Sequence, residues 1–381
     1  MTVTCSRSWL RPQRFKLTIS SASVYRWAKR VLEAGSVPND GFYFGVTENY
    51  CQRAAELRDR FSRKYGDIAV FGDGDCGQLG CGEAVTEARK PKVVANLRGV
   101  PIGKVSAGGL HSLALTDHGT VYSWGCNDEG SLGWLATAEK DDGALPSEVK
   151  GFHPSEHGPN GRTKEIMAAP FEQRAEAVIA QVATGDTQSL ALSVDGDVYE
   201  WGTMKDNEGR KFRNMPPADD PRPATGHKNM DNLEEDDSPE WYQPPRGNQD
   251  WPAHVADMPG RATAVSAGNS FNAALMEDST LVTWGIGTCG ELARPVPKLT
   301  KKTPNKVVLE DYLTPKPPLW DGPQMKRKVS AMSCGGFHLL VVVRGKGPSV
   351  YASGLNQYGQ LGLGDTTQRE VLTKVSKEHL T

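Results

Sequence analysis

Residues 71–80 read FGDGDCGQLG, and three of their glycines have the spacing G-x-G-x-x-G. This spacing is typical of loops that bind the phosphates of a dinucleotide, in which a strand precedes the loop and a helix begins at the last glycine. Here residues 78–82 read QLGCG, and a helix does not tolerate two further glycines at its start. The spacing alone therefore does not indicate a nucleotide site.

The same stretch recurs along the chain, as WGCNDEGSLG at 124–133, WGIGTCGELA at 284–293 and SGLNQYGQLG at 353–362. Each copy keeps the first and third glycine and the leucine, while the middle glycine returns only at Gly287. A phosphate-binding loop would occur once in the chain and would need its middle glycine. A repeating fold needs the other two many times, so we interpret the stretch as part of a structural repeat.

A second recurring element lies upstream of these loops. Residues 105–125, 182–202 and 265–285 are copies of one pattern, and residues 332–354 are a degenerate copy. Each contains two short apolar runs around a turn signal, which is the pattern of a β-hairpin. Residues 121–124 and 198–201, VYSW and VYEW, are the expected return strands.

These copies predict an all-β fold, a propeller of four-stranded antiparallel blades. Each unit is a small sheet that cannot bury both of its faces alone, and radial packing hides them. We expect the pairs Ala107-Gly108 and Ala267-Gly268 to be small because the inner strands crowd toward the axis. The residues expected to fill the seams between units are Leu79, Leu132, Leu292 and Leu361.

The composition agrees with a turn-rich β protein, since the 381 residues include 41 Gly and 25 Pro. A formal net charge of −2 argues against whole-surface attraction to nucleic acid or to an anionic membrane. The seven Cys are dispersed without a C-x-x-C pair, so we expect reduced thiols and neither a disulfide framework nor a zinc site. No apolar run reaches the roughly 18 residues of a membrane span. We expect no metal, no cofactor and a monomer.

The repeats resemble those of the regulator of chromosome condensation family, whose members are seven-bladed β-propellers. The resemblance covers about residues 67–375. The loops at 77–80, 125–130 and 202–209 resemble the first three blades of the chromatin-bound member that exchanges nucleotide on the small GTPase Ran. It implies a guanine-nucleotide exchange factor that binds the nucleotide-free state of Ran and promotes GDP release, with no bond made or broken.

The resemblance also assigns residues to this work. Residues 205–209 resemble the β-wedge that the family's Ran-exchanging member inserts against the GTPase, and residues 295–315 correspond to a long partner-facing loop. The residues implied in GTPase binding and exchange are Lys205, Asp206, Asn207, Glu208, Gly209, Asp186, His111, Asp75, Asp128 and Arg294. The same residue types also form solvated turns, turn caps and structural histidines, and these alternatives stay open.

Two features depart from the family pattern. About five units precede Thr381, so about two blades and the ring-closing strand are missing, either because this is a fragment or because the ring closes differently. Ser270 stands where the Ran-exchanging relatives tend to carry an acidic residue. A non-catalytic interaction propeller is therefore the alternative function.

The chain divides into a basic extension at 1–65, partly helical or disordered, and the repeats at 66–381. The repeats contain a proline-rich, acidic insertion at 215–260, which we expect to be a disordered loop or an acidic patch for a basic partner such as histones. The basic extension is typical of a tail that contacts DNA or histones in the nucleus, with the cytoplasm as a further location. It also resembles a mitochondrial transit peptide.

Overall fold

The computed structural model describes residues 66–134, 143–154, 176–214, 249–323, 327–345 and 347–376. The basic extension, including the short helix expected at 51–64, lies outside the described residues. So do residues 215–248 of the insertion.

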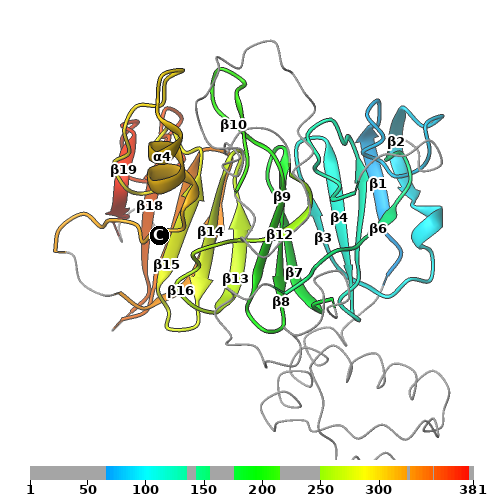
Figure 1. Ribbon diagram of the computed structural model, residues 1–381, viewed down its shortest axis with the longest axis horizontal. Coiled ribbons are helices and arrows are strands. Elements are labelled where there is room, and N and C mark those ends of the chain that lie inside the picture. The colour runs from blue at the N-terminus through cyan, green and yellow to red at the C-terminus, as the bar shows by residue number, and fades with distance from the viewer. Residues whose placement is uncertain are drawn as a thin grey trace, which may run out of the picture.

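Antiparallel sheets stand side by side as blades, with their strands running in the same general direction (Figure 1). Three blades have four strands and one has three. The β3–β6 blade contains β3 (Ile102–Ala107), β4 (His111–Thr116), β5 (Val121–Gly125) and β6 (Ser147–Val149). The β7–β12 blade contains β7 (Ile179–Thr184), β8 (Gln188–Ser193), β9 (Val198–Gly202) and β12 (Gln249–His254).

The remaining strands follow the same order. The β13–β15 blade contains β13 (Ala262–Ala267), β14 (Phe271–Met276) and β15 (Leu281–Gly285). The β16–β19 blade contains β16 (Val329–Cys334), β17 (His338–Val343), β18 (Ser349–Gly354) and β19 (Arg369–Lys374). Two-stranded sheets are formed by β1 (Ala69–Asp73) with β2 (Glu87–Val93), and by β10 (Met204–Lys205) with β11 (Lys211–Phe212). The short helices are η1 (Ala95–Leu97), α4 (Asn305–Val307) and η4 (Val308–Leu313).

The predicted hairpins are confirmed. The return strands at 121–124 and 198–201 lie in β5 and β9, which pair with β4 and β8 in register. The seam leucines are buried as expected, with Leu79 4% exposed and Leu132, Leu292 and Leu361 at most 1% exposed. The all-β propeller prediction is therefore correct for the described residues.

The crowding expected at the inner turns is also observed. The hairpin turns of neighbouring blades are joined by backbone hydrogen bonds. The Asp186 N–H donates to Asn269 O at 3.1 Å, and the Asn269 N–H donates to Gly336 O at 2.9 Å. The backbones come this close because glycines precede or follow these residues. A methyl group on Gly268 would overlap the Phe271 ring and lie 2.6 Å from Gly335 O.

Two tryptophans each connect their blade to the loop that precedes it. Trp124 donates its indole N–H to Gln78 O at 3.0 Å, and Trp201 donates to Ser131 O at 2.8 Å. Both carbonyls stand directly before the seam leucine of the preceding loop. The recurring G-x-x-x-x-G-x-L loop thus supplies a leucine plug and a carbonyl acceptor at each of these two seams.

The insertion predicted at 215–260 needs a correction. Residues 249–254 are not irregular but form β12, the outer strand of the β7–β12 blade, which pairs with β9. The prediction failed because Pro252 reads as a strand breaker. In the structure this proline lies where the register shifts between Gln249 and Ala253, on an edge strand where a missing N–H is tolerated.

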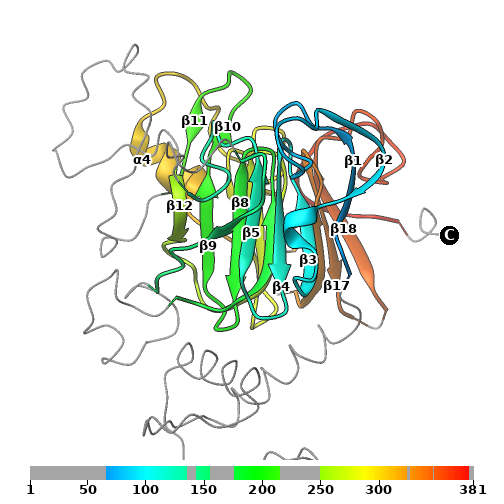
Figure 2. The same ribbon diagram turned by 90° about the vertical axis from the view of Figure 1, so that its right-hand side faces the viewer.

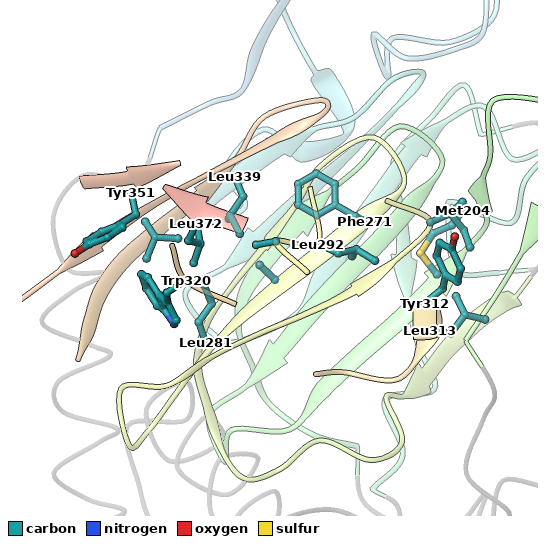
Figure 3. Close-up of a cluster of buried hydrophobic side chains, with 14 of the residues drawn as sticks. Met204, Phe271, Leu281, Leu292, Tyr312, Leu313, Trp320, Leu339, Tyr351 and Leu372 are labelled. Atoms are coloured by element: carbon teal, nitrogen blue, oxygen red, sulfur yellow. The ribbon is translucent and has the colours of Figure 1, made fainter. Parts of the chain in front are cut away.

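Residues 295–315 contain the helices α4 and η4 and are tied into the core. Val308, Tyr312 and Leu313 are each 1% exposed and pack in one cluster with Phe271 and Leu292 (Figure 3). This segment is therefore a packed part of the β13–β15 blade as well as a connection.

Gly268→Ala is expected to destabilise the protein by about 1–3 kcal/mol, because the added methyl group has no space between Phe271 and Gly335. Gly260→Ala is the matched control, since nothing lies within 4 Å of a Cβ at that position. The free energy of unfolding from urea titration measures both. Equal stability of the two variants would contradict the crowding at the axis.

Candidate functional site

Residues 204–212 form a small hairpin, which we call the wedge hairpin, made of β10, β11 and the turn between them. It follows β9 directly and extends beyond the end of the blades at which β9 ends (Figures 1 and 2). Its base is rooted in the core, since Met204 and Phe212 are each 1% exposed and pack in the cluster that contains Phe271 and Tyr312. The hairpin predicted from the sequence is therefore present.

Asp206 organises the turn of the wedge hairpin. Its carboxylate accepts hydrogen bonds from the backbone N–H groups of Glu208, at 3.0 Å, and Arg210, at 2.9 Å. It also forms an ion pair with the Arg210 guanidinium, with Nε 2.5 Å from Oδ2. The Asp206 side chain is only 3% exposed, so it holds the turn together and offers little surface to a partner.

Neighbouring blades hold the wedge hairpin from both sides. Glu129, in the loop after β5, lies between Lys205 and Lys211, with carboxylate oxygens 2.6 Å and 2.9 Å from the two ammonium groups. On the other side, Ser270 Oγ accepts a hydrogen bond from the Lys205 backbone N–H at 3.1 Å. Ser270, the residue that departs from the family pattern, thus anchors the hairpin to the β13–β15 blade.

The exposed part of the wedge hairpin is its tip, Asn207, Glu208 and Gly209. Gly209 has φ +76°, which explains the need for glycine there. Of the five residues predicted in this segment, the structure therefore assigns Lys205 and Asp206 to holding the hairpin and leaves the other three on its surface.

Asp186 lies in the turn between β7 and β8, at the same end of the blade as the wedge hairpin, because Gln188 pairs with Gly202. The residue is exposed, and its carboxylate lies against Gly109 of the preceding blade. Asp75 and Asp128 are exposed in the loops after β1 and β5. The structure thus brings these carboxylates to the end of the blades that carries the wedge hairpin.

His111, which the resemblance implies in GTPase binding, is buried, and its position agrees with the open alternative of a structural histidine. It is 2% exposed, and its Nε2 lies 2.9 Å from Ser189 Oγ on the neighbouring blade. Burial lowers the pKa of His111 to about 4, so the imidazole is neutral at physiological pH. His111 therefore serves to join β4 to β8 by a hydrogen bond. The sequence pattern could not show which way the first residue of the strand points.

Arg294 also lies inside the protein, at 8% exposed. It donates hydrogen bonds to the carbonyls of Thr283, at 3.0 Å, and Asp311, at 3.2 Å, and so ties the segment at 295–315 to β15. Burial lowers its pKa to about 10, against the opposing effect of Asp311. Arg294, which the resemblance implies in GTPase binding, thus makes structural contacts and offers little surface to a partner.

Sequence reasoning missed Glu200, which is 4% exposed in the middle of β9. Its carboxylate accepts hydrogen bonds from Trp284 Nε1 at 2.9 Å, Asn272 Nδ2 at 3.1 Å and Asn214 Nδ2 at 3.2 Å. Burial raises the pKa of Glu200 to about 7, against the lowering effect of these three donors. A signal was present: the equivalent residues of β5 and β15 are Ser123 and Thr283, so a carboxylate there is unusual.

No group of three or more His, Cys, Asp or Glu side chains that could hold a metal ion is found within the described ranges. The same residues contain no helix that is long and apolar enough to span a membrane.

Residues 67–381 match the RCC1-like domain family. The chain belongs to this family. The RCC1-like chain is 30% identical over 299 residues to the Regulator of chromosome condensation of Mus musculus, covering 78% of this chain and 57% of that protein. It is 28% identical over 302 residues to the Ultraviolet-B receptor UVR8 of Arabidopsis thaliana, covering 79% and 52%. The RCC1-like chain thus spans little more than half the length of these curated relatives.

Solved structures show the same fold. Prp20p from Saccharomyces cerevisiae, whose structure was described with its binding to Gsp1p and histones, superposes with a TM-score of 0.58 at 23% identity. That match covers 84% of this chain and 62% of Prp20p. Human WBSCR16 superposes with a TM-score of 0.53 at 19% identity, covering 82% and 63%. The RCC1-like chain is therefore a propeller-type protein.

Glu291→Gln is expected to change how stability depends on pH. Glu291 is 2% exposed, and burial raises its pKa from 4.5 to about 7. Because the folded carboxyl group binds its proton more tightly than the unfolded one, its contribution to stability is present below about pH 4.5 and is lost as pH rises to about 7.

The glutamine variant cannot ionise, so it should gain stability relative to the natural chain across this window, by on the order of 3 kcal/mol. Urea unfolding between pH 5 and pH 8 measures the difference. Parallel stability curves for the two proteins would contradict the raised pKa of the buried Glu291.

Proposed function

We propose that this chain is a guanine-nucleotide exchange factor for the small GTPase Ran. The observation that carries the proposal is the wedge hairpin, held from both sides by Glu129 and Ser270 with the tip at 207–209 exposed. Asp186 lies at the same end of the blades. The relative Prp20p was described as binding Gsp1p, which supports a GTPase as the partner.

The exchange would work by differential affinity and involve no bond-making chemistry. A protein that binds the nucleotide-free GTPase more tightly than the GDP-bound one raises the release rate of GDP, and GTP then enters because it is more abundant. Phosphates in a P-loop are held by backbone N–H groups and a lysine. The carboxylates of Glu208 and Asp186 would compete with the phosphates for such positive groups, which requires no cofactor or metal.

Additional partners are also proposed. The basic extension at 1–65 and the description of Prp20p as a histone-binding protein support a nuclear location with histones or DNA as additional partners. The alternative function is a non-catalytic interaction propeller. It is favoured by Ser270, whose hydroxyl anchors the wedge hairpin where exchanging relatives tend to carry an acid.

The purified chain should accelerate release of fluorescent GDP from Ran in the presence of excess GTP, by about tenfold or more, the scale of a coupling free energy of 1–3 kcal/mol. A double variant, Asn207→Ala with Glu208→Ala, removes the polar side chains of the tip and should abolish most of this acceleration while leaving the fold intact. The matched control is Glu277→Ala with Asp278→Ala, in the turn between β14 and β15 at the other end of the blades.

A folded natural chain that leaves the GDP release rate unchanged would rule out the proposal. Stable binding of Ran without any acceleration would favour the interaction propeller.

Asp186→Asn is expected to lower the exchange rate by about tenfold or more, because it removes one charge that would face the GTPase, a loss of ~1.4 kcal/mol or more. Stability should not change, since the backbone hydrogen bond from Asp186 to Asn269 is kept. The same assay with Asp195→Asn, in the turn between β8 and β9, is the control. An unchanged rate for Asp186→Asn would exclude this carboxylate from the exchange surface.

A further inference from the structure

Glu200 occupies a strand position that, in two other blades, carries a hydroxyl that donates to the loop after the strand. Ser123 Oγ donates a hydrogen bond to Leu132 O at 2.7 Å, and Thr283 Oγ1 donates to Leu292 O at 2.7 Å. In both cases the hydroxyl holds the loop that follows its own strand. After β9 this loop is replaced by the wedge hairpin, and Glu200 instead accepts a hydrogen bond from Asn214, two residues beyond β11.

Glu200 also accepts a tryptophan hydrogen bond that a loop carbonyl accepts elsewhere. The indoles of Trp124 and Trp201 donate to backbone carbonyls of the preceding recurring loop, Gln78 O and Ser131 O. The recurring loop is absent after β9, and the next tryptophan, Trp284, donates to Glu200 Oε2 at 2.9 Å. One buried carboxylate therefore joins the base of the wedge hairpin to the next blade.

The third donor fixes the orientation of this contact. Asn272 Nδ2 donates to Glu200 Oε1 at 3.1 Å, while Asn272 Oδ1 accepts from Gln188 Nε2 at 3.3 Å. Because the Asn272 amide is used on both sides, it cannot turn its oxygen toward residue 200 without losing the bond to Gln188. The site therefore presents three N–H groups to the two carboxylate oxygens of Glu200.

We propose that Glu200 is a positioning residue, which fixes the wedge hairpin against the β13–β15 blade by accepting hydrogen bonds from Asn214, Asn272 and Trp284. The hairpin is thereby presented in one orientation. A role of Glu200 in nucleotide exchange rests on the proposed function, whereas its hold on the hairpin does not.

The charge on Glu200 is governed by burial and by these donors. On the elements packed around it, His254 of β12 faces Asp197, Arg213 lies near Asp250, and the two lysines of the wedge hairpin pair with Glu129. Burial raises the pKa of Glu200 to about 7. Because the folded site disfavours the ionised carboxylate relative to water, ionisation of Glu200 costs stability as pH rises toward 7, and the three donors offset part of this cost.

Hydrogen–deuterium exchange of the full chain tests this inference without a partner. In Glu200→Gln an NH₂ group replaces one acceptor oxygen, and the amides of residues 203–214 should exchange about tenfold faster, the effect of losing a hydrogen bond to a charged group. Asn214→Ala removes only the hairpin's side of the contact and should loosen the same residues. Leu115→Ala, in the core of the β3–β6 blade, is the control for general loss of stability.

The location of the change separates positioning from general stability. In Glu200→Gln and Asn214→Ala the faster exchange should be confined to residues 203–214, whereas in Leu115→Ala it should appear in the strands of the blades. Unchanged protection in both Glu200→Gln and Asn214→Ala, or an equal rise in Leu115→Ala, would overturn the inference. If the natural chain releases no GDP from Ran, the proposed function fails while this measurement still decides the role of Glu200.

Discussion

The structure depends on how closely the inner turns of neighbouring blades approach each other. Backbone hydrogen bonds run from Gly109 to the Gly185-Asp186 turn, from Asp186 to Asn269 and from Asn269 to Gly336. This line of contacts forms only because side chains are missing on one side of each turn. A Cβ on Gly109 would overlap the Asp186 carboxylate, and one on Gly268 would overlap Phe271. The glycines therefore set the spacing of the blades, and this spacing fixes the loops at one end relative to one another.

A second layer of contacts uses that spacing. Once the blades are fixed, a tryptophan of one blade reaches the loop of the preceding one, as Trp201 reaches Ser131 O. The wedge hairpin interrupts this repeat, because it replaces the loop that would supply the carbonyl. The chain compensates with polar residues: Glu200 inside the seam, and Glu129 with Ser270 at its surface. The hairpin is thus the place where the repeat is broken and where the most specific polar contacts gather, as expected of a functional element.

The sequence predicted the structural features that recur in every repeat, and it missed features that occur in one blade alone. The spacing of glycine and leucine was sufficient for the hairpins and for the buried plugs Leu132 and Leu361. It was insufficient for His111 and Arg294, since a repeat gives the position of a residue in a strand or loop but not the direction of its side chain. Contacts such as Lys205 with Glu129 join residues 76 apart, and no local pattern reports them. The outer strand β12 was missed because its proline is tolerated only at a shifted register on an edge.

The arrangement of charges in the wedge hairpin also indicates how it would act. Lys205 and Lys211 form ion pairs with Glu129, and Arg210 forms one with Asp206, so their side chains are already ordered. The side chains left at the tip are the amide of Asn207 and the carboxylate of Glu208, of which Glu208 is also 3.7 Å from Arg210. A partner at this hairpin would meet a preformed shape whose tip exposes one amide and one carboxylate, and little conformational entropy would be lost on binding. A rigid element of this kind would distinguish two states of a partner by fit, because it would not adapt to both.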